Sequence, residues 1–102
     1  MATHVTIVGS GDMARAIATR LIAGGAHVSL AARNLPAAKA LAEELGRDGS
    51  AVDVGPLGEP IAADIVVLAV PYGAIAEVVA AYGERLAGKT VVDITNPVDW
   101  ST

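Results

Sequence analysis

Residues 5–14, which read VTIVGSGDMA, decide the fold of this chain. A short, mostly apolar stretch leads directly into the spacing Gly-x-Gly-x-x-Ala, and an amphipathic stretch follows. Gly9 permits a tight turn that a side chain would obstruct, Gly11 lets the backbone approach a pyrophosphate, and Ala14 lets the helix sit close to the strand. Strand, glycine turn and helix in this order indicate a dinucleotide-binding fold, with the helix N-terminus facing the phosphates. The alternative is a turn that is purely structural.

The alternation of strand and helix patterns continues along the chain. Helical spacing predicts a first helix at 12–23 that ends at Gly24-Gly25, a second that begins around Asn34-Leu35-Pro36 and stops at Gly46, and a third at 73–86. Apolar stretches predict strands at 5–9, 27–31, 51–54, 64–70 and 90–94. With right-handed crossovers, these elements form an α/β fold with a doubly wound parallel sheet of the Rossmann type, about five strands in the order 3-2-1-4-5.

Apolar residues at helical spacing predict which face of each helix is buried. The unbroken apolar stretch 65–70 predicts a central strand buried on both faces. The predicted buried faces are Met13, Ile17, Leu21 and Ile22 in the first helix, Ala38, Leu41, Ala42 and Leu45 in the second, and Ile75, Val78, Val79, Tyr82 and Leu86 in the third.

Composition excludes several classes of protein. The 102 residues are enough for one domain, 53% of them are apolar, and there is no cysteine. Disulfides, thiolate metal sites and cysteine nucleophiles are therefore absent. The net charge is −4 without a basic run, so nucleic-acid binding has no electrostatic basis. The chain shows no signal-peptide pattern and no apolar run long enough to span a membrane, which predicts a soluble cytoplasmic protein.

The residues after the second predicted strand decide between the two nicotinamide cofactors. An NAD site places Asp or Glu about twenty residues past the glycines, to hold the ribose hydroxyls. This chain has Ala31-Ala32-Arg33-Asn34 there. Arg33 can pair with a 2′-phosphate through charge-assisted hydrogen bonds, which favours NADP(H). The alternative for Arg33 is a solvated loop side chain.

Two further strand ends face the same crevice in a parallel sheet. The fourth predicted strand ends in Val70-Pro71, and the fifth leads to Asn96-Pro97. Both prolines would stiffen loops that face a cofactor, and Asn96 could bond a ribose or a carboxamide. Proline also commonly punctuates strand ends, so a purely structural interpretation stays open.

No catalytic set is recognisable in this chain. His4 and His27 flank strands without a second ligand nearby in sequence, and we interpret them as surface or packing residues. Asp93 is interpreted as a structural carboxylate. No metal site and no catalytic residue are predicted.

Four ordered motifs, GSGDMA, AARN, AVPY and DITNPVD, resemble the N-terminal NADP-binding domain of NADP-dependent coenzyme F-420 reductases. The resemblance implies that residues of the first motif wrap the pyrophosphate and that the later motifs hold the rest of the cofactor. By motif, the implied contacts are Gly9, Ser10, Gly11, Asp12 and Met13 with the pyrophosphate, Arg33 and Asn34 with the 2′-phosphate, Val70 and Pro71 with the adenosine ribose, and Asn96 and Pro97 with the nicotinamide.

The resemblance also implies a second substrate. In that family a deazaflavin, coenzyme F-420, stacks on the nicotinamide for direct hydride transfer, so the protein supplies orientation and no acid or base is demanded. The chain departs from the family pattern at Ala32, which replaces a hydroxyl donor, and at Asp12, where a neutral residue is common. Lys39 is the nearest basic residue on the next helix.

Other functions remain open from the sequence. A pyrroline-5-carboxylate reductase also begins with a Gly-x-Gly-x-Met-Ala pattern, although AVPY fits that family less well. A non-catalytic NADP-binding or sensing module is the third candidate. We expect residues 1–102 to be one dinucleotide-binding domain, the N-terminal part of a longer enzyme, and we expect it to form a homo-oligomer because the sheet leaves an edge to cover.

Overall fold

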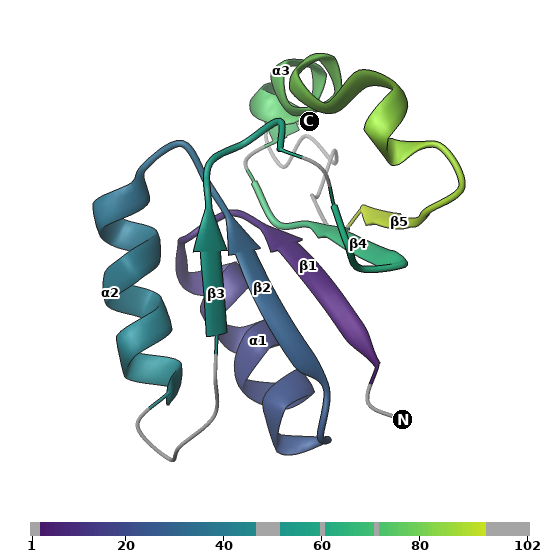
Figure 1. The fold of residues 1–102 in the computed structure, drawn as a ribbon. Helices are drawn as coiled ribbons and strands as arrows, with labels where there is room; N and C mark the ends of the chain where they lie inside the picture. Colours follow the sequence, from purple (N-terminus) through teal and green to yellow (C-terminus); the bar gives the residue numbers. More distant parts are fainter. Residues whose placement is uncertain (1–2, 47–51, 60, 71, 94–102) are drawn as a thin grey trace, which may run out of the picture.

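The computed structural model describes residues 3–46, 52–59, 61–70 and 72–93, which form one parallel sheet flanked by helices (Figure 1). The sheet order is β3-β2-β1-β4-β5, which confirms the predicted topology. All four strand pairs are parallel. In chain order the elements are β1 (His4–Val8), α1 (Asp12–Ala23), β2 (His27–Ala31), α2 (Leu35–Leu45), β3 (Val52–Gly55), β4 (Ile65–Leu68), α3 (Ile75–Tyr82) and β5 (Thr90–Asp93).

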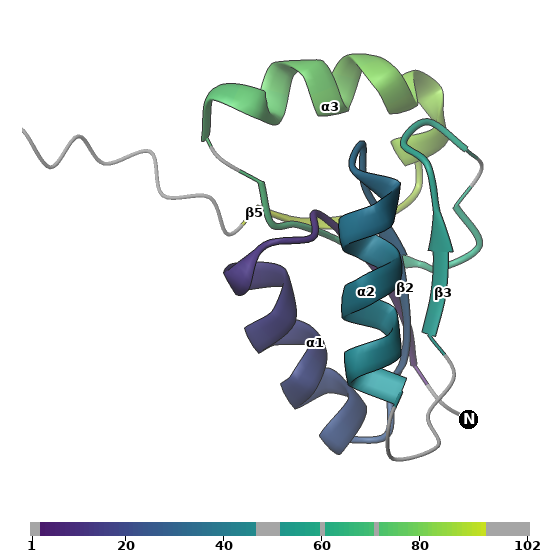
Figure 2. The same ribbon diagram turned by 90° about the vertical axis from the view of Figure 1, so that its left-hand side faces the viewer.

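The two faces of the sheet carry separate apolar clusters. The helices α1 and α2 lie side by side on one face, whereas α3 lies across the carboxyl ends of the strands (Figure 2). Under α1 and α2, alternate residues of β1 and β2 form the first cluster: Val5, Ile7, Val28 and Leu30. Under α3, the second cluster contains Val8, Ala31, Val66, Leu68, Val78 and Tyr82. This two-sided burial is why the strand sequences are almost continuously apolar.

The buried face of α1 differs from the prediction at Met13, the first of the residues predicted to be buried. Met13 is 53% exposed, whereas Ala14 and Ala18 are fully buried against the sheet. Because residues four apart share one face of a helix, the Ala14–Ala18 row turns Met13 outward. The larger Ile17 and Leu21 pack beside this row, partly buried. The small residues let the helix axis approach the strands closely.

The third predicted helix, 73–86, is in fact three pieces. A 3₁₀ turn at Tyr72–Ala74 precedes α3, and a second at Gly83–Leu86 follows it. Gly83 has a φ of 52°, outside the α-helical region, so the helix ends there. The predicted burial of Val79 is also wrong, since this residue is 45% exposed beside the buried Val78.

Helix ends and strand ends follow the local sequence signals closely. The side chain of Asn34 accepts a hydrogen bond from the backbone N–H of Ala37 at 3.1 Å, as expected for an N-cap. Gly24 and Gly46 cap the carboxyl ends of α1 and α2. The strands differ from their predicted bounds by one or two residues: β4 ends at Leu68 rather than at position 70, and positions 51 and 94 lie outside the described residues.

Candidate functional site

A cleft of about 240 Å³ lies at the carboxyl ends of β1, β2 and β4. The chain leaves β1 toward β2 on one side and β4 pairs with β1 on the other, so the cleft sits where the strand order reverses. This is the position at which open parallel sheets bind ligands. Its lining residues come from four segments: Val8, Gly9, Ser10 and Gly11; Ala32, Arg33 and Asn34; Leu57; and Ala69, Val70, Ala74 and Val78.

The turn at Gly9 is held between the two neighbouring strands. Its backbone N–H donates to the carbonyl of Ala31 at 2.8 Å, and the N–H of Ala69 donates to the carbonyl of Val8 at 2.9 Å. Gly9 has a φ of 136°, and a Cβ there would overlap the carbonyl oxygen of Ala69. The predicted tight turn is therefore confirmed, and its glycine requirement comes from both φ and space.

The second glycine has a different environment. Gly11 is the N-cap of α1 with an ordinary φ of −91°, and a Cβ built on it meets no atom within 4 Å. Among the described residues, no side chain makes a capping hydrogen bond to this helix end. The N–H groups of the first turn have no partner inside the helix, and Ser10 and Gly11, which precede them, line the cleft. A helix N-terminus of this kind attracts an anion such as a pyrophosphate.

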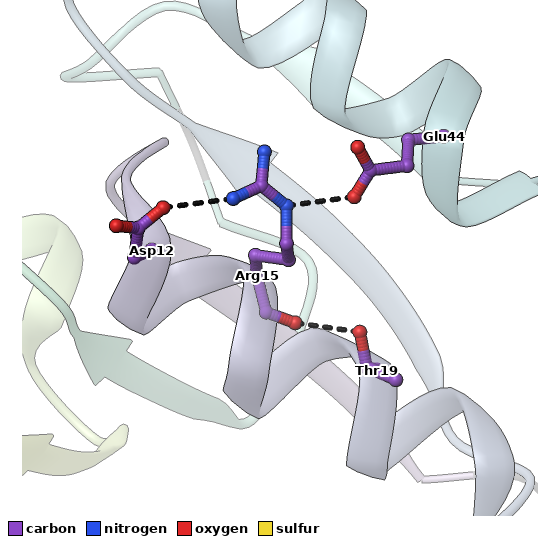
Figure 3. A network of polar contacts seen from close by, with 4 residues as sticks. All are labelled: Asp12, Arg15, Thr19 and Glu44. Atoms are coloured by element: carbon purple, nitrogen blue, oxygen red, sulfur yellow. Dashed lines mark hydrogen bonds and ion pairs between the residues drawn. The ribbon is translucent and has the colours of Figure 1, made fainter.

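Asp12 is turned away from the cleft into a polar network (Figure 3). Its carboxylate accepts from Nη1 of Arg15 at 2.8 Å, and Nε of Arg15 donates to Glu44 of α2 at 2.7 Å. The Asp12 side chain is 99% exposed, and Arg15 partly offsets its charge. Of the predicted pyrophosphate residues, Gly9, Ser10 and Gly11 line the cleft, whereas Asp12 and Met13 do not.

Arg33 lines the cleft from the segment after β2, where the sequence places it. Its Nη1 donates to both carboxylate oxygens of Glu77 on α3, at 2.7 and 2.8 Å. Sequence reasoning missed Glu77, because it reads as one more acidic residue on a solvated helix and lies 44 positions from Arg33. Asn34 also lines the cleft, while its side chain caps α2.

The remaining wall of the cleft is apolar. Leu57, Ala69, Ala74 and Val78 form it together with the predicted Val70. A flat, uncharged ring could pack against such a wall, and the other lining residues include the glycine turn and the guanidinium of Arg33. Of the predicted site residues, Pro71, Asn96 and Pro97 lie outside the described part of the chain.

Residues 4–97 match the sequence model of the family described as "NADP oxidoreductase coenzyme F420-dependent". The chain belongs to this family. Its parallel sheet and its cleft are those of an NAD(P)-binding oxidoreductase-like domain.

Three individual proteins that are similar to this chain come from different organisms. The metalloreductase STEAP3 of Rattus norvegicus is 31% identical over 98 residues, which cover 96% of this chain and 19% of that protein. A hypothetical protein SMa0349 from Sinorhizobium meliloti has a TM-score of 0.76 and 30% identity, covering 98% of this chain and 47% of that one. A reductive aminase from Aspergillus terreus, in complex with NADPH4, cyclohexanone and allyl amine, has a TM-score of 0.73 and 26% identity, covering 96% and 34%. The family domain described here thus spans less than half the length of each of these relatives.

This family member has a second hollow, of about 230 Å³, on the α3 side of the sheet. Its polar lining residues include His4, Ser29 and Asp53. His4 shares a hydrogen bond with Ser29 at 2.7 Å, His27 pairs with Asp53 at 3.0 Å, and the two imidazoles stack at 4.3 Å between ring centroids. The hollow lies away from the glycine turn, and the described residues contain no group of three potential metal ligands. The first cleft is therefore the candidate cofactor site.

The surroundings of His4 predict that stability depends on pH. Burial, and then the neighbouring imidazole of His27, lowers the pKa of His4 below its ordinary value of 6.5; Lys89 acts in the same direction, and Asp53 and Asp64 oppose it. The unfolded chain therefore binds this proton more readily than the folded one, so stability is complete above a pH of about 6.5 and is lost as the pH falls toward the folded pKa. We expect the urea midpoint to fall between about pH 8 and about pH 5, and His4→Gln to reduce that fall. An unchanged pH dependence in His4→Gln would assign the effect to other groups.

Among the described residues, no helix is both long enough and apolar enough to cross a bilayer.

Proposed function

We propose that this domain binds NADP(H) in the cleft at the carboxyl ends of β1, β2 and β4. The observation that carries the proposal is the meeting of the Gly9–Gly11 turn and Arg33 in one cleft. The segment after β2 contains no carboxylate, which a ribose-binding NAD site would place there. The proposed preference for NADP(H) over NAD(H) rests on the presence of Arg33 and the absence of an acidic residue in this segment.

The cleft fits the chemistry of the cofactor part by part. The open N–H groups at the start of α1 suit the pyrophosphate, and the missing Cβ of Gly11 leaves it room. Arg33 suits the 2′-phosphate, since a guanidinium and a phosphate pair through parallel charge-assisted bonds. The apolar wall of Leu57, Val70 and Val78 suits the adenine ring. The structural similarity to a reductive aminase in complex with NADPH4 supports the same assignment.

We further propose that the whole protein exchanges a hydride between NADP(H) and a deazaflavin of the coenzyme F-420 type. When bound, the nicotinamide supplies a ring carbon that gains or loses a hydride, which is one proton with two electrons. This chain's residues bind and orient the cofactor, and Asn96 and Pro97 are proposed near its nicotinamide end. The family description supports the deazaflavin as the second substrate. The similarity to STEAP3 favours a metal ion as the alternative electron acceptor.

An assay of NADPH oxidation with each acceptor decides between the deazaflavin and the metal ion. The full-length protein that contains this domain should be assayed with NADPH and either coenzyme F-420 or a chelated ferric ion, and NADPH oxidation should be followed. Oxidation with the deazaflavin alone is the expected result. Oxidation with ferric ion alone would replace the proposed acceptor without changing the proposed cofactor.

The NADP preference is tested by Arg33→Ala. We expect the variant to bind NADPH ~10–100-fold more weakly and NADH almost as before, because only NADPH loses about 1.4–3 kcal/mol of phosphate pairing. Calorimetric titration with both cofactors measures this. Arg20→Ala, which removes an exposed arginine near the other end of α1, is the matched control and should change neither affinity. Equal losses for both cofactors in Arg33→Ala would show that Arg33 does not bind the 2′-phosphate.

A further inference from the structure

We infer that Glu77 competes with the 2′-phosphate of NADP(H) for Arg33, and so sets both the affinity for NADPH and the preference over NADH. The inference rests on the proposed function, because it concerns the same cleft. It assigns a role to a residue outside the glycine turn and outside the segment after β2.

Glu77 lies in direct contact with Arg33, which lines the cleft. Arg33 comes from the segment between β2 and α2, whereas Glu77 belongs to α3 and directly precedes Val78, which lines the cleft. Both Glu77 oxygens accept from Nη1 of Arg33, at 2.7 and 2.8 Å. The ion pair thus connects two sides of the cleft through the one arginine that the 2′-phosphate needs.

The pair is exposed enough to exchange partners. The Arg33 and Glu77 side chains are 63% and 56% exposed. Exposed ion pairs are weak because water screens both charges, so a dianionic phosphate can displace a single carboxylate. Displacement still has a cost, because Glu77 must first release Arg33. NADH lacks this phosphate, so its binding does not depend on the exchange.

Removing the carboxylate of Glu77 is expected to increase the affinity for NADPH. Glu77→Gln keeps the size of the side chain and removes its charge, which leaves Arg33 free for the phosphate. We expect NADPH to bind about 5-fold more tightly to Glu77→Gln, the upper range for an exposed pair, and NADH to bind with less than about 2-fold change. Glu84→Gln, an equal change of charge on another exposed acid after α3, should leave both affinities unchanged.

A double-substitution cycle tests whether Glu77 acts through Arg33. Calorimetry should compare the wild-type chain, Glu77→Gln, Arg33→Ala and the double variant with NADPH and NADH. Loss of the Glu77→Gln gain in the Arg33→Ala background is the expected result. An undiminished gain there would mean direct repulsion of the phosphate, and would overturn the competition for Arg33.

The outcomes also separate this inference from the proposed function. If the wild-type chain prefers NADPH and Glu77→Gln leaves that affinity unchanged, the proposed function stands and the role of Glu77 is overturned. If the wild-type chain and Glu77→Gln bind neither cofactor, the proposed function fails and the inference falls with it. A urea titration of Glu77→Gln against the wild type checks that folding is the same in both.

Discussion

Gly9→Ala is expected to lower the free energy of unfolding by about 3 kcal/mol. Two costs add at this position. Alanine is strained at a φ of 136°, and its Cβ would overlap the backbone carbonyl oxygen of Ala69. A carbonyl fixed at the end of β4 cannot move aside as a flexible side chain could. Urea titration followed by circular dichroism measures the loss.

Gly25→Ala is the control that separates these two costs. Gly25 has a φ of 90°, but a Cβ there meets no atom within 4 Å. Backbone strain alone should lower stability by only about 1 kcal/mol. Similar losses in both variants would contradict the proposed role of the contact with Ala69 and would attribute the whole effect to φ.

Gly11→Ala is expected to leave the fold intact and to weaken binding of both NADPH and NADH by about 100-fold, because its Cβ enters the space of the pyrophosphate. In the protein itself, the ordinary φ and the open surroundings of Gly11 tolerate a methyl group. Stability should fall by less than about 1 kcal/mol, the usual difference between glycine and alanine at an N-cap. Calorimetry for binding and urea titration for stability measure the two quantities separately.

The same substitution far from the cleft provides the control. Gly46 caps the carboxyl end of α2 with a φ of −87° and has no atom within 4 Å of a built Cβ. Gly46→Ala should leave both cofactor affinities unchanged. If Gly11→Ala binds both cofactors as the wild type does, the pyrophosphate does not lie at the start of α1. Because Arg33→Ala is expected to affect NADPH alone, the two variants also distinguish the two phosphate positions.

The parts of the site that the sequence predicted are local in the chain. Gly9 and Ala14 belong to one strand–turn–helix unit, so their roles follow from spacing alone. The position of Arg33 follows from the end of the next strand. In the same way, the alternation of patterns predicts the sheet order, because right-handed crossovers leave few alternatives.

The parts that escaped prediction depend on packing between distant segments. Glu77 meets Arg33 only because α3 lies across the strand ends, and its sequence context is that of any solvated acid. The rotation of α1 that exposes Met13 follows from two alanines, which an apolar-face rule ranks below a methionine. The helix ends at Gly83 because this residue adopts a positive φ. Glycine can adopt this conformation but can also continue a helix, so the sequence alone does not predict the break.

The order in which the strands pair constrains when the cleft can form during synthesis of the chain. The central strand β1 pairs with β4 in a register that joins Val5 to Ile65, about sixty positions later. Such long-range pairing has to wait for the later segment, and long closures slow folding. Gly9 rests against Ala69 at the end of β4, so the turn lacks one of its supports until that strand has left the ribosome. A nascent segment that ends before Ala69 would therefore contain the whole sequence from Gly9 to Ala14 without the contact that supports the turn.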